Sequence, residues 1–282
     1  MAGSTSINNV RRGYADTSDG QMHYLIAGQG YPVVLLHMTS EAASQYETVL
    51  PELARRGYCA ISIDLPGHGN SYRPSVQPVA KDYARSVKET LDALGVQRAT
   101  VQGHHFGSVV AAWTYRFYPQ LVDRLCFYGW TRHDAELRAS RRSAGPREYL
   151  ADGEAIKKSW IRRWEMGRTG LKDGEPSRCT EEQALRYFVA KLQAGKNWHW
   201  AYHCIGNTDP LEMAANIHCP VLLFAGPGDL NWQRSIDAVG DFPDARFVPM
   251  ADWIGENAPE EDPAAFAAIM DNFIKGTAPG RA

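Results

Sequence analysis

Short apolar runs alternate with longer amphipathic stretches along most of this 282-residue chain. The runs have the length of strands and are apolar without alternation, which is typical of strands buried on both faces of a parallel sheet. They lie at residues 31–37 (YPVVLLH), 58–64 (YCAISID), 99–102 (ATVQ), 122–128 (VDRLCFY), 220–226 (PVLLFAG) and 245–250 (ARFVPM). Helical spacing is found at about 43–56, 79–94 and 263–275. This order predicts an α/β fold with a doubly wound, mostly parallel sheet.

The pattern changes after residue 132. Residues 133–209 are helical in spacing, charged and rich in aromatic side chains, and strand patterns return only at 220–226. We therefore expect a core domain made of residues 1–132 and 210–282, interrupted by a helical cap, or lid, at 133–209. An insertion at the carboxyl ends of parallel strands covers the place where ligands bind in such sheets.

Charge and cysteine usage narrow the function classes. Lys and Arg total 30 and Asp and Glu total 32, a formal net charge of −2, so no nucleic-acid partner is expected. The chain has no run of about 18 apolar residues, and its N-terminus (MAGSTSINNVRR) lacks the apolar segment of a secretory signal. We expect no membrane partner, a cytoplasmic location and a small-molecule substrate; a homodimer stays open. Five scattered cysteines without C-x-x-C spacing indicate reduced thiols.

A candidate catalytic turn lies in ATVQGHHFGSVVAAW, residues 99–113. It is predicted as a strand, a glycine-flanked turn and a helix of small residues, the pattern of a G-x-S-x-G nucleophile elbow. Here the five positions are Gly103, His104, His105, Phe106 and Gly107, so a histidine stands where such a turn carries serine.

Four motifs in this order make the chain resemble the α/β-hydrolase superfamily with a helical cap, over nearly its whole length. They are HMTS at 37–40, like the H-G-x turn; DLPGHGNS at 64–71, like D-x-x-G-x-G-x-S; GHHFG at 103–107; and GPGDLNW at 226–232, like the loop that carries the catalytic acid.

The resemblance assigns positions, and two of them hold unusual residues. The nucleophile position, usually Ser and sometimes Asp or Cys, holds His105. The segment MADWIGENAPE (250–260) aligns with the family's G-G-H-W-P-x-x-E-x-P pattern and puts Asp252 at the histidine position, while Asp229 keeps the acid position. The family's oxyanion hole implies the backbone N–H groups of Phe106 and of Met38 or Thr39.

This set predicts general acid/base catalysis. An imidazole on the turn can reach Asp229, Asp252 or both, and a carboxylate on one ring nitrogen leaves the other a good base. Ser108 and Ser71 are not expected to replace the missing nucleophile. With an oxyanion hole, a histidine base suits hydrolysis of an ester or lactone, and equally lyase- or cyclase-type proton abstraction beside a carbonyl. An acyl-imidazole is a less favoured route, and a non-catalytic ligand-binding protein is the alternative.

Aromatic residues of the cap and loops suggest an apolar cavity for a ring-containing or polyketide-like carbonyl compound. The weaker candidates for substrate contact are Trp130, His133, Trp164, Trp198, His203, Trp232 and Trp253. The basic run RASRR at 138–142 is interpreted as a solvated helix face, and attraction of an anionic substrate is the less favoured alternative. No cofactor and no metal are expected.

Overall fold

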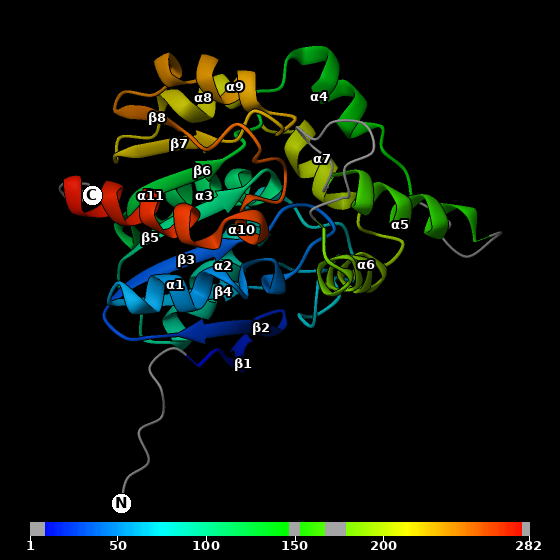
Figure 1. Cartoon of the computed structure of the whole chain (residues 1–282), viewed down its shortest axis with the longest axis horizontal. Coiled ribbons are helices and arrows are strands. Elements are labelled where there is room, and N and C mark those ends of the chain that lie inside the picture. Colours follow the sequence, from blue (N-terminus) through cyan, green and yellow to red (C-terminus); the bar gives the residue numbers. More distant parts are fainter. Residues whose placement is uncertain (1–8, 147–152, 167–178, 278–282) are drawn as a thin grey trace, which may run out of the picture.

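The computed structural model describes residues 9–146, 153–166 and 179–277. Within them a sheet of eight strands has the order β1-β2-β4-β3-β5-β6-β7-β8 (Figure 1). β1 and β2 pair antiparallel, β2 pairs antiparallel with β4, and the pairs from β4 to β8 are parallel. The strands are β1 (Arg11–Thr17), β2 (Gly20–Ala27), β3 (Tyr31–Leu36), β4 (Tyr58–Ile63), β5 (Ala99–His104), β6 (Val122–Tyr128), β7 (Val221–Ala225) and β8 (Ala245–Pro249).

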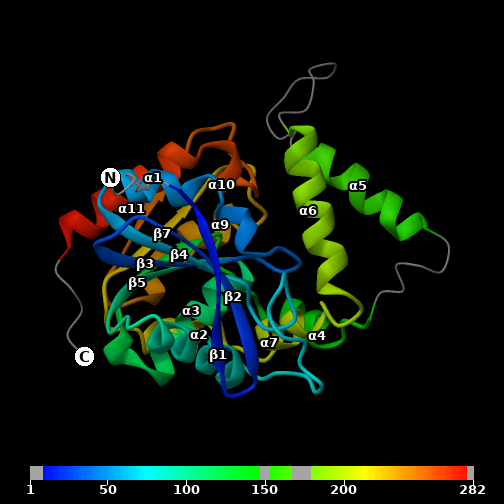
Figure 2. The same cartoon turned by 90° about the horizontal axis from the view of Figure 1, so that it is seen from below.

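Helices cover both faces of the sheet (Figure 2). α1 (Val49–Arg55) and α11 (Pro263–Gly276) lie on one face, and α2 (Ala80–Ala93) and α3 (Phe106–Phe117) lie on the other. The remaining helices are α4 (Ala135–Arg142), α5 (Glu154–Met166), α6 (Glu181–Ala194), α7 (Trp200–Gly206), α8 (Pro210–Ala215), α9 (Trp232–Asp237) and α10 (Ala258–Glu261), with short 3-10 turns η1 (Ala43–Tyr46), η2 (Pro119–Leu121) and η3 (Val239–Asp241).

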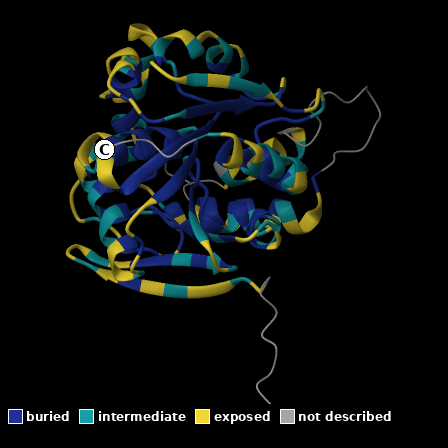
Figure 3. Ribbon diagram, turned by 90° about the vertical axis from the view of Figure 1, so that its left-hand side faces the viewer, coloured by how far each residue is buried: buried dark blue, intermediate teal, exposed yellow. Residues whose placement is uncertain are grey.

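The central strands are buried because both of their faces pack against helices (Figure 3). β3 shows this directly, since Val34 and Leu36 join the apolar cluster beneath α2 and α3, and Val33 and Leu35 join the cluster beneath α1 and α11. Each such side chain contributes about 1.5–3 kcal/mol when fully buried. This is the reason for runs without polar alternation, and the predicted fold class is confirmed.

The structure differs from the sequence-based expectation in two places. The single helix expected at 43–56 is split into η1 and α1. Pro51 explains the break: it has no N–H to continue a helix from η1, but it is tolerated in the first turn of α1. The hairpin of β1 and β2 was not anticipated, because β1 is largely exposed and shows no apolar run.

The chain between β6 and β7 carries α4 to α8, and α4–α7, here called the cap helices, lie beyond the carboxyl ends of the parallel strands (Figures 1 and 2). Several contacts join α6 to the core, among them two short hydrogen bonds. Arg186 Nη2 donates to Glu260 Oε1 at 2.6 Å, and Arg73 Nη2 donates to the carbonyl of Gln193 at 2.8 Å. None of the helices in the described ranges has both the length and the hydropathy needed to span a bilayer.

Candidate active site

His105 occupies a strained bend between β5 and α3. Its φ of 45° and ψ of −104° lie outside the regions that L-residues ordinarily adopt. Two glycines permit the tight approach. A Cβ on Gly107 would lie 2.8 Å from the carbonyl oxygen of His37, and a Cβ on Gly103 would overlap the backbone of Gly107 and Ser108. The bend therefore has the elbow geometry that the glycine spacing predicted.

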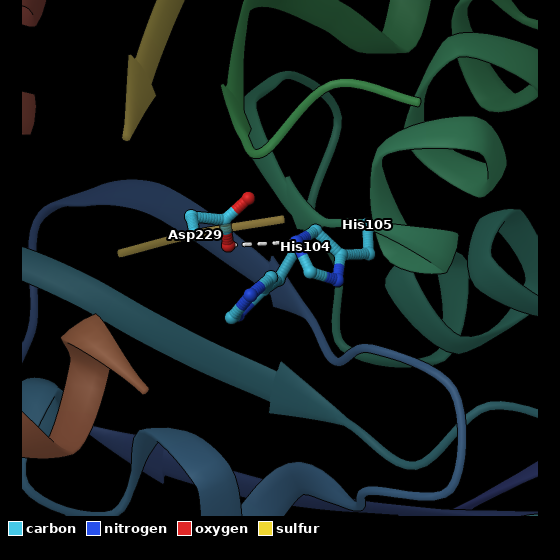
Figure 4. Close-up of side chains that lie close together, drawn as sticks. All are labelled: His104, His105 and Asp229. Carbon is cyan, nitrogen blue, oxygen red and sulfur yellow. Dashed lines mark hydrogen bonds and ion pairs between the residues drawn. The ribbon is translucent and has the colours of Figure 1, made fainter. Parts of the chain in front are cut away.

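The ring of His105 is hydrogen-bonded to Asp229. His105 Nε2 lies 2.8 Å from Asp229 Oδ2 (Figure 4). The other carboxylate oxygen accepts the backbone N–H of Asn231 at 2.7 Å. Because the carboxylate accepts, Nε2 carries the proton and Nδ1 has the lone pair. Among the described residues Nδ1 has no hydrogen-bond partner, and the side chain is 16% exposed. His105 thus offers an accessible base.

The charges around His105 favour its protonated form. Burial alone lowers the pKa of His105, but the charge of Asp229, its hydrogen bond and the further charge of Glu256 outweigh burial, so the pKa is raised above 6.5. Arg141 acts in the opposite direction and lowers this pKa. The carboxylate of Asp229 is therefore the partner that stabilises the protonated ring.

A cavity of about 300 Å³ opens over His105. The loops after β3, β5, β6, β7 and β8 contribute to its wall, and so do the cap helices. Its lining consists of Met38, Thr39, Ser40, His105, Thr131, His133, Leu137, Arg141, Arg162, Tyr187, Lys191, Trp198, Tyr202, Ile205, Leu230, Asn231, Arg234 and Glu256. The cavity has the volume of a small-molecule site and the position expected of one in an open α/β sheet.

Asp252 does not reach this cavity, contrary to the expectation from the motif. It is exposed, whereas Glu256, four residues later, lines the cavity and influences the pKa of His105. A backbone bond from Ile254 N to Ala251 O closes a turn that directs Asp252 outward. The chain then returns to pair Gly255 with Gly228, and Glu256 follows inward.

The three backbone N–H groups expected around an oxyanion differ in whether a hydrogen-bond acceptor already engages them. The N–H of Met38 donates to Gln45 Oε1 at 3.1 Å, so this group is engaged. Thr39 lines the cavity. Phe106 is the first residue of α3, where a helix has no internal acceptor for the N–H group. Thr39 and Phe106 are therefore the stronger pair of the three predicted donors.

His104 lies beside the pair but is held as a neutral ring. Because Gln45 Oε1 accepts from Met38, its amide nitrogen donates to His104 Nδ1 at 2.9 Å, which places the His104 proton on Nε2. Burial lowers the pKa of His104 well below its ordinary value. The ligand atoms of His104, His105 and Asp229 lie within 4.8 Å of one another, but a protonated Nε2 is no metal ligand. The geometry favours a proton-transfer pair over a metal centre.

Two of the seven weaker candidates line the cavity, namely His133 and Trp198. The other five are held outside the cavity by packing or by hydrogen bonds. Trp130 is fully buried and stacks on Phe127, and His203 is bonded to Gln77 and to the carbonyl of Ala144. Trp164 packs edge-on against Trp160, Trp232 packs edge-on against Phe247, and Trp253 packs against the core beneath α1 and α11.

The two serines that were not expected to replace the nucleophile use their hydroxyls in hydrogen bonds to the backbone. Ser108 Oγ donates to the carbonyl of Gly103 at 2.7 Å, and Ser71 Oγ donates to the carbonyl of Asp64 at 2.6 Å. Ser40, which the motifs did not single out, lines the cavity at a positive φ of 66°.

The cavity is more basic than its aromatic sequence context indicated. Among the described lining residues are four cations, Arg141, Arg162, Lys191 and Arg234, and one carboxylate, Glu256. The basic run at 138–142 was the available signal, but only the placement of α4 against α7 decides which of its arginines faces inward.

Comparisons with known proteins agree with this architecture. A family model described as alpha/beta hydrolase fold matches residues 31–162. The solved enol-lactonase of Burkholderia xenovorans superposes with a TM-score of 0.76 at 18% identity and covers 93% of this chain and 100% of that one. An epoxide hydrolase mutant of Vigna radiata has a TM-score of 0.79 at 19% identity and covers 95% and 99%. The protein therefore has the α/β-hydrolase fold.

Curated relatives match parts of the chain, and the chain spans about a third of the length of the first of them. A soluble epoxide hydrolase of a Corynebacterium species is 36% identical over 105 residues, 37% of this chain and 36% of that protein. An uncharacterized Mycobacterium tuberculosis protein is 37% identical over 103 residues, 36% of this chain and only 30% of its own length. The (E)-2-((N-methylformamido)methylene)succinate hydrolase of Acinetobacter baylyi is 24% identical over 212 residues, 74% of this chain and 76% of that protein.

Proposed function

We propose that this protein is a hydrolase in which His105 acts as a general base and activates water for attack on an ester or lactone carbonyl. The supporting observation is the 2.8 Å bond between His105 Nε2 and Asp229 Oδ2, on a bend that opens into the cavity. Several relatives are named as hydrolases, and one structural neighbour as an enol-lactonase, which favours hydrolysis over lyase- or cyclase-type chemistry.

In this mechanism Nδ1 of His105 accepts a proton from water while the water oxygen bonds to the carbonyl carbon. The electron pair of the carbonyl moves to its oxygen, and the N–H groups of Phe106 and Thr39 stabilise the resulting oxyanion. When the carbon–oxygen bond to the leaving group breaks, Nδ1 returns the proton to that oxygen. Asp229 holds Nε2–H throughout and stabilises the imidazolium.

Carbonyl chemistry is preferred to epoxide opening because of the backbone donors. An oxyanion formed at a former carbonyl needs N–H groups beside the base, and in this proposal Thr39, in the loop after β3, and Phe106, the first residue of α3, supply them. An epoxide oxygen would need a proton donor opposite the base. Among the described lining residues Tyr187, Tyr202 and Glu256 carry such groups, so the preference for carbonyl chemistry rests on the backbone donors and on the enol-lactonase neighbour.

The test is hydrolysis of an activated neutral ester, 4-nitrophenyl acetate, by the wild type and by His105→Ala. Removal of a general base lowers kcat/KM by about 10²–10⁴-fold. His218→Ala is the matched control, because His218 is exposed and lies outside the cavity. Equal activity of wild type and His105→Ala would refute the base role. If the wild type binds the ester but does not hydrolyse it, the result would instead indicate a binding protein.

Pre-steady-state kinetics separates the base from a nucleophile. A base gives linear release of nitrophenol and no acylated protein in mass spectra. A burst, with an acetyl adduct on His105, would show the acyl-imidazole route.

A further inference from the structure

Arg141 is the least satisfied cation in the cavity wall. It lies in the last turn of α4, and its guanidinium stacks on the ring of Tyr202 with 4.4 Å between the guanidinium carbon and the ring centroid. Within the described ranges it donates no hydrogen bond and forms no ion pair, and its Nε is buried without a partner. A guanidinium has five N–H donors in a planar fork that matches a carboxylate.

A second arginine and a buried histidine lie in the same part of the cavity. Arg234 of α9 donates only from Nη1, to the carbonyl of Leu230 and to Asn231 Oδ1, and has no ion pair among the described residues. His133 is 6% exposed and its Nδ1 has no partner. Burial, followed by the charges of Arg141 and Arg234, lowers the pKa of His133 to about 4, so both arginines lie near a neutral His133.

Within the described residues, neither Glu256 nor Asp229 forms an ion pair with Arg141 or Arg234. Among the described lining residues Glu256 carries the carboxylate, and it forms an ion pair with Arg162, with 4.0 Å between Nη2 and Oε2. Asp229 is committed to His105 and to the backbone of Asn231. Two uncompensated guanidiniums in a partly enclosed cavity are costly unless an anion joins them.

We propose that the cavity selects a substrate that carries a carboxylate, which Arg141 binds through a charge-assisted, bidentate contact, with Arg234 adding a second positive charge. This inference rests on the proposed function, since it places the anionic end of the substrate in the cavity whose reactive end lies at His105. The substrate class is the half-ester or carboxylated lactone of a small dicarboxylic acid. It differs in charge from the apolar compound that the aromatic residues suggested.

The experiment compares two esters that differ in one charge: mono-4-nitrophenyl adipate and its methyl ester. Rates are taken above the buffer blank at low ionic strength. A hydrogen bond to a charged group corresponds to about 10- to 150-fold in affinity. The wild type should prefer the acid by about that factor in kcat/KM. Arg141→Gln should abolish the preference by slowing the acid alone, and Arg141→Lys should keep part of it.

Arg142→Gln is the matched control, because Arg142 is the exposed neighbour of Arg141 and donates to the carbonyl of Gly206 outside the cavity. Its selectivity should equal that of the wild type. Equal rates for both esters with the wild type, or an equal loss for both with Arg141→Gln, would overturn the proposal.

A binding measurement keeps the carboxylate site testable if the wild type hydrolyses neither ester. Monomethyl adipate and dimethyl adipate are then titrated by calorimetry against wild type and Arg141→Gln. Binding of the monoacid by the wild type alone would support the carboxylate site while the proposed hydrolysis fails. Equal affinity of the two compounds, or of the two proteins for the monoacid, would refute the site itself.

Discussion

Gly129 packs against the hydrogen-bonded pair of His105 and Asp229 and offers a sharp test of its geometry. This residue follows β6 at a φ of 63°. A Cβ at this position would lie 2.5 Å from His105 Nε2 and 2.8 Å from Asp229 Oδ1. Both distances are too short for a carbon, so Gly129→Ala must move the ring, the carboxylate or the strand end.

The expected cost has two parts. An alanine at positive φ costs about 1–2 kcal/mol, and overpacking at a buried site costs about 1–3 kcal/mol. The free energy of unfolding of Gly129→Ala should therefore fall by about 2–5 kcal/mol. A displacement of the base by about 1 Å should lower kcat/KM by about 10²-fold.

Gly95→Ala isolates the backbone part. Gly95 has a φ of 71°, and a Cβ there would meet nothing within 4 Å. Urea unfolding followed by circular dichroism, with ester hydrolysis measured on the same samples, compares the two variants. Gly95→Ala should lose about 1–2 kcal/mol and no activity. If Gly129→Ala is as stable and as active as Gly95→Ala, the close packing of Gly129 against His105 and Asp229 is refuted. If the protein hydrolyses no ester, NMR titration of His105 reports the same displacement.

Three further predictions follow from the charges. Asp229→Asn should shift the pKa of His105 from above to below 6.5, since burial then dominates, and lower kcat/KM by about 10²–10⁴-fold; an unchanged NMR titration of His105 would contradict the pairing. Glu256→Gln should lower the same pKa by less and move the rising limb of the pH–rate profile to lower pH, because the deprotonated base is active; an unmoved limb would argue against its influence. His68 is neutral in the fold, where burial lowers its pKa from 6.5 to about 3, so its contribution is present above pH 6.5 and lost on acidification, by about 2 kcal/mol at pH 5. His68→Gln should show a shallower fall in urea stability between pH 7 and pH 5, and an identical slope would be evidence against the shift.

The sequence identified those features that local pattern determines. Strands such as β5 and β6 were recognisable because burial on both faces removes polar residues from a whole run. The bend at His105 was recognisable because only glycines at 103 and 107 allow the close approach. Asp229 was recognisable because it lies in the loop that follows β7.

Other features depend on contacts that no local pattern encodes. The motif alignment favoured Asp252, whereas a turn closed between Ala251 and Ile254 brings Glu256 inward instead. The inward arginine of α4 could not be chosen from the sequence, because Tyr202 of another helix receives its guanidinium. The sequence could not choose between Met38 and Thr39 as an oxyanion donor, because the bond from the N–H of Met38 to the side chain of Gln45, seven residues along the chain, is visible only in the structure.

The bend after β5 is held by its backbone. His105 N donates to the carbonyl of Tyr128 at 3.1 Å, and Ser108 N donates to the carbonyl of His105 at 3.0 Å, while the imidazole takes no part in either bond. Evolution can therefore exchange the reactive group at this position without rebuilding the scaffold. A single base change converts a histidine codon into an aspartate codon, so one mutation separates two chemistries on the same architecture. Laboratory selection can likewise start from substitutions at position 105.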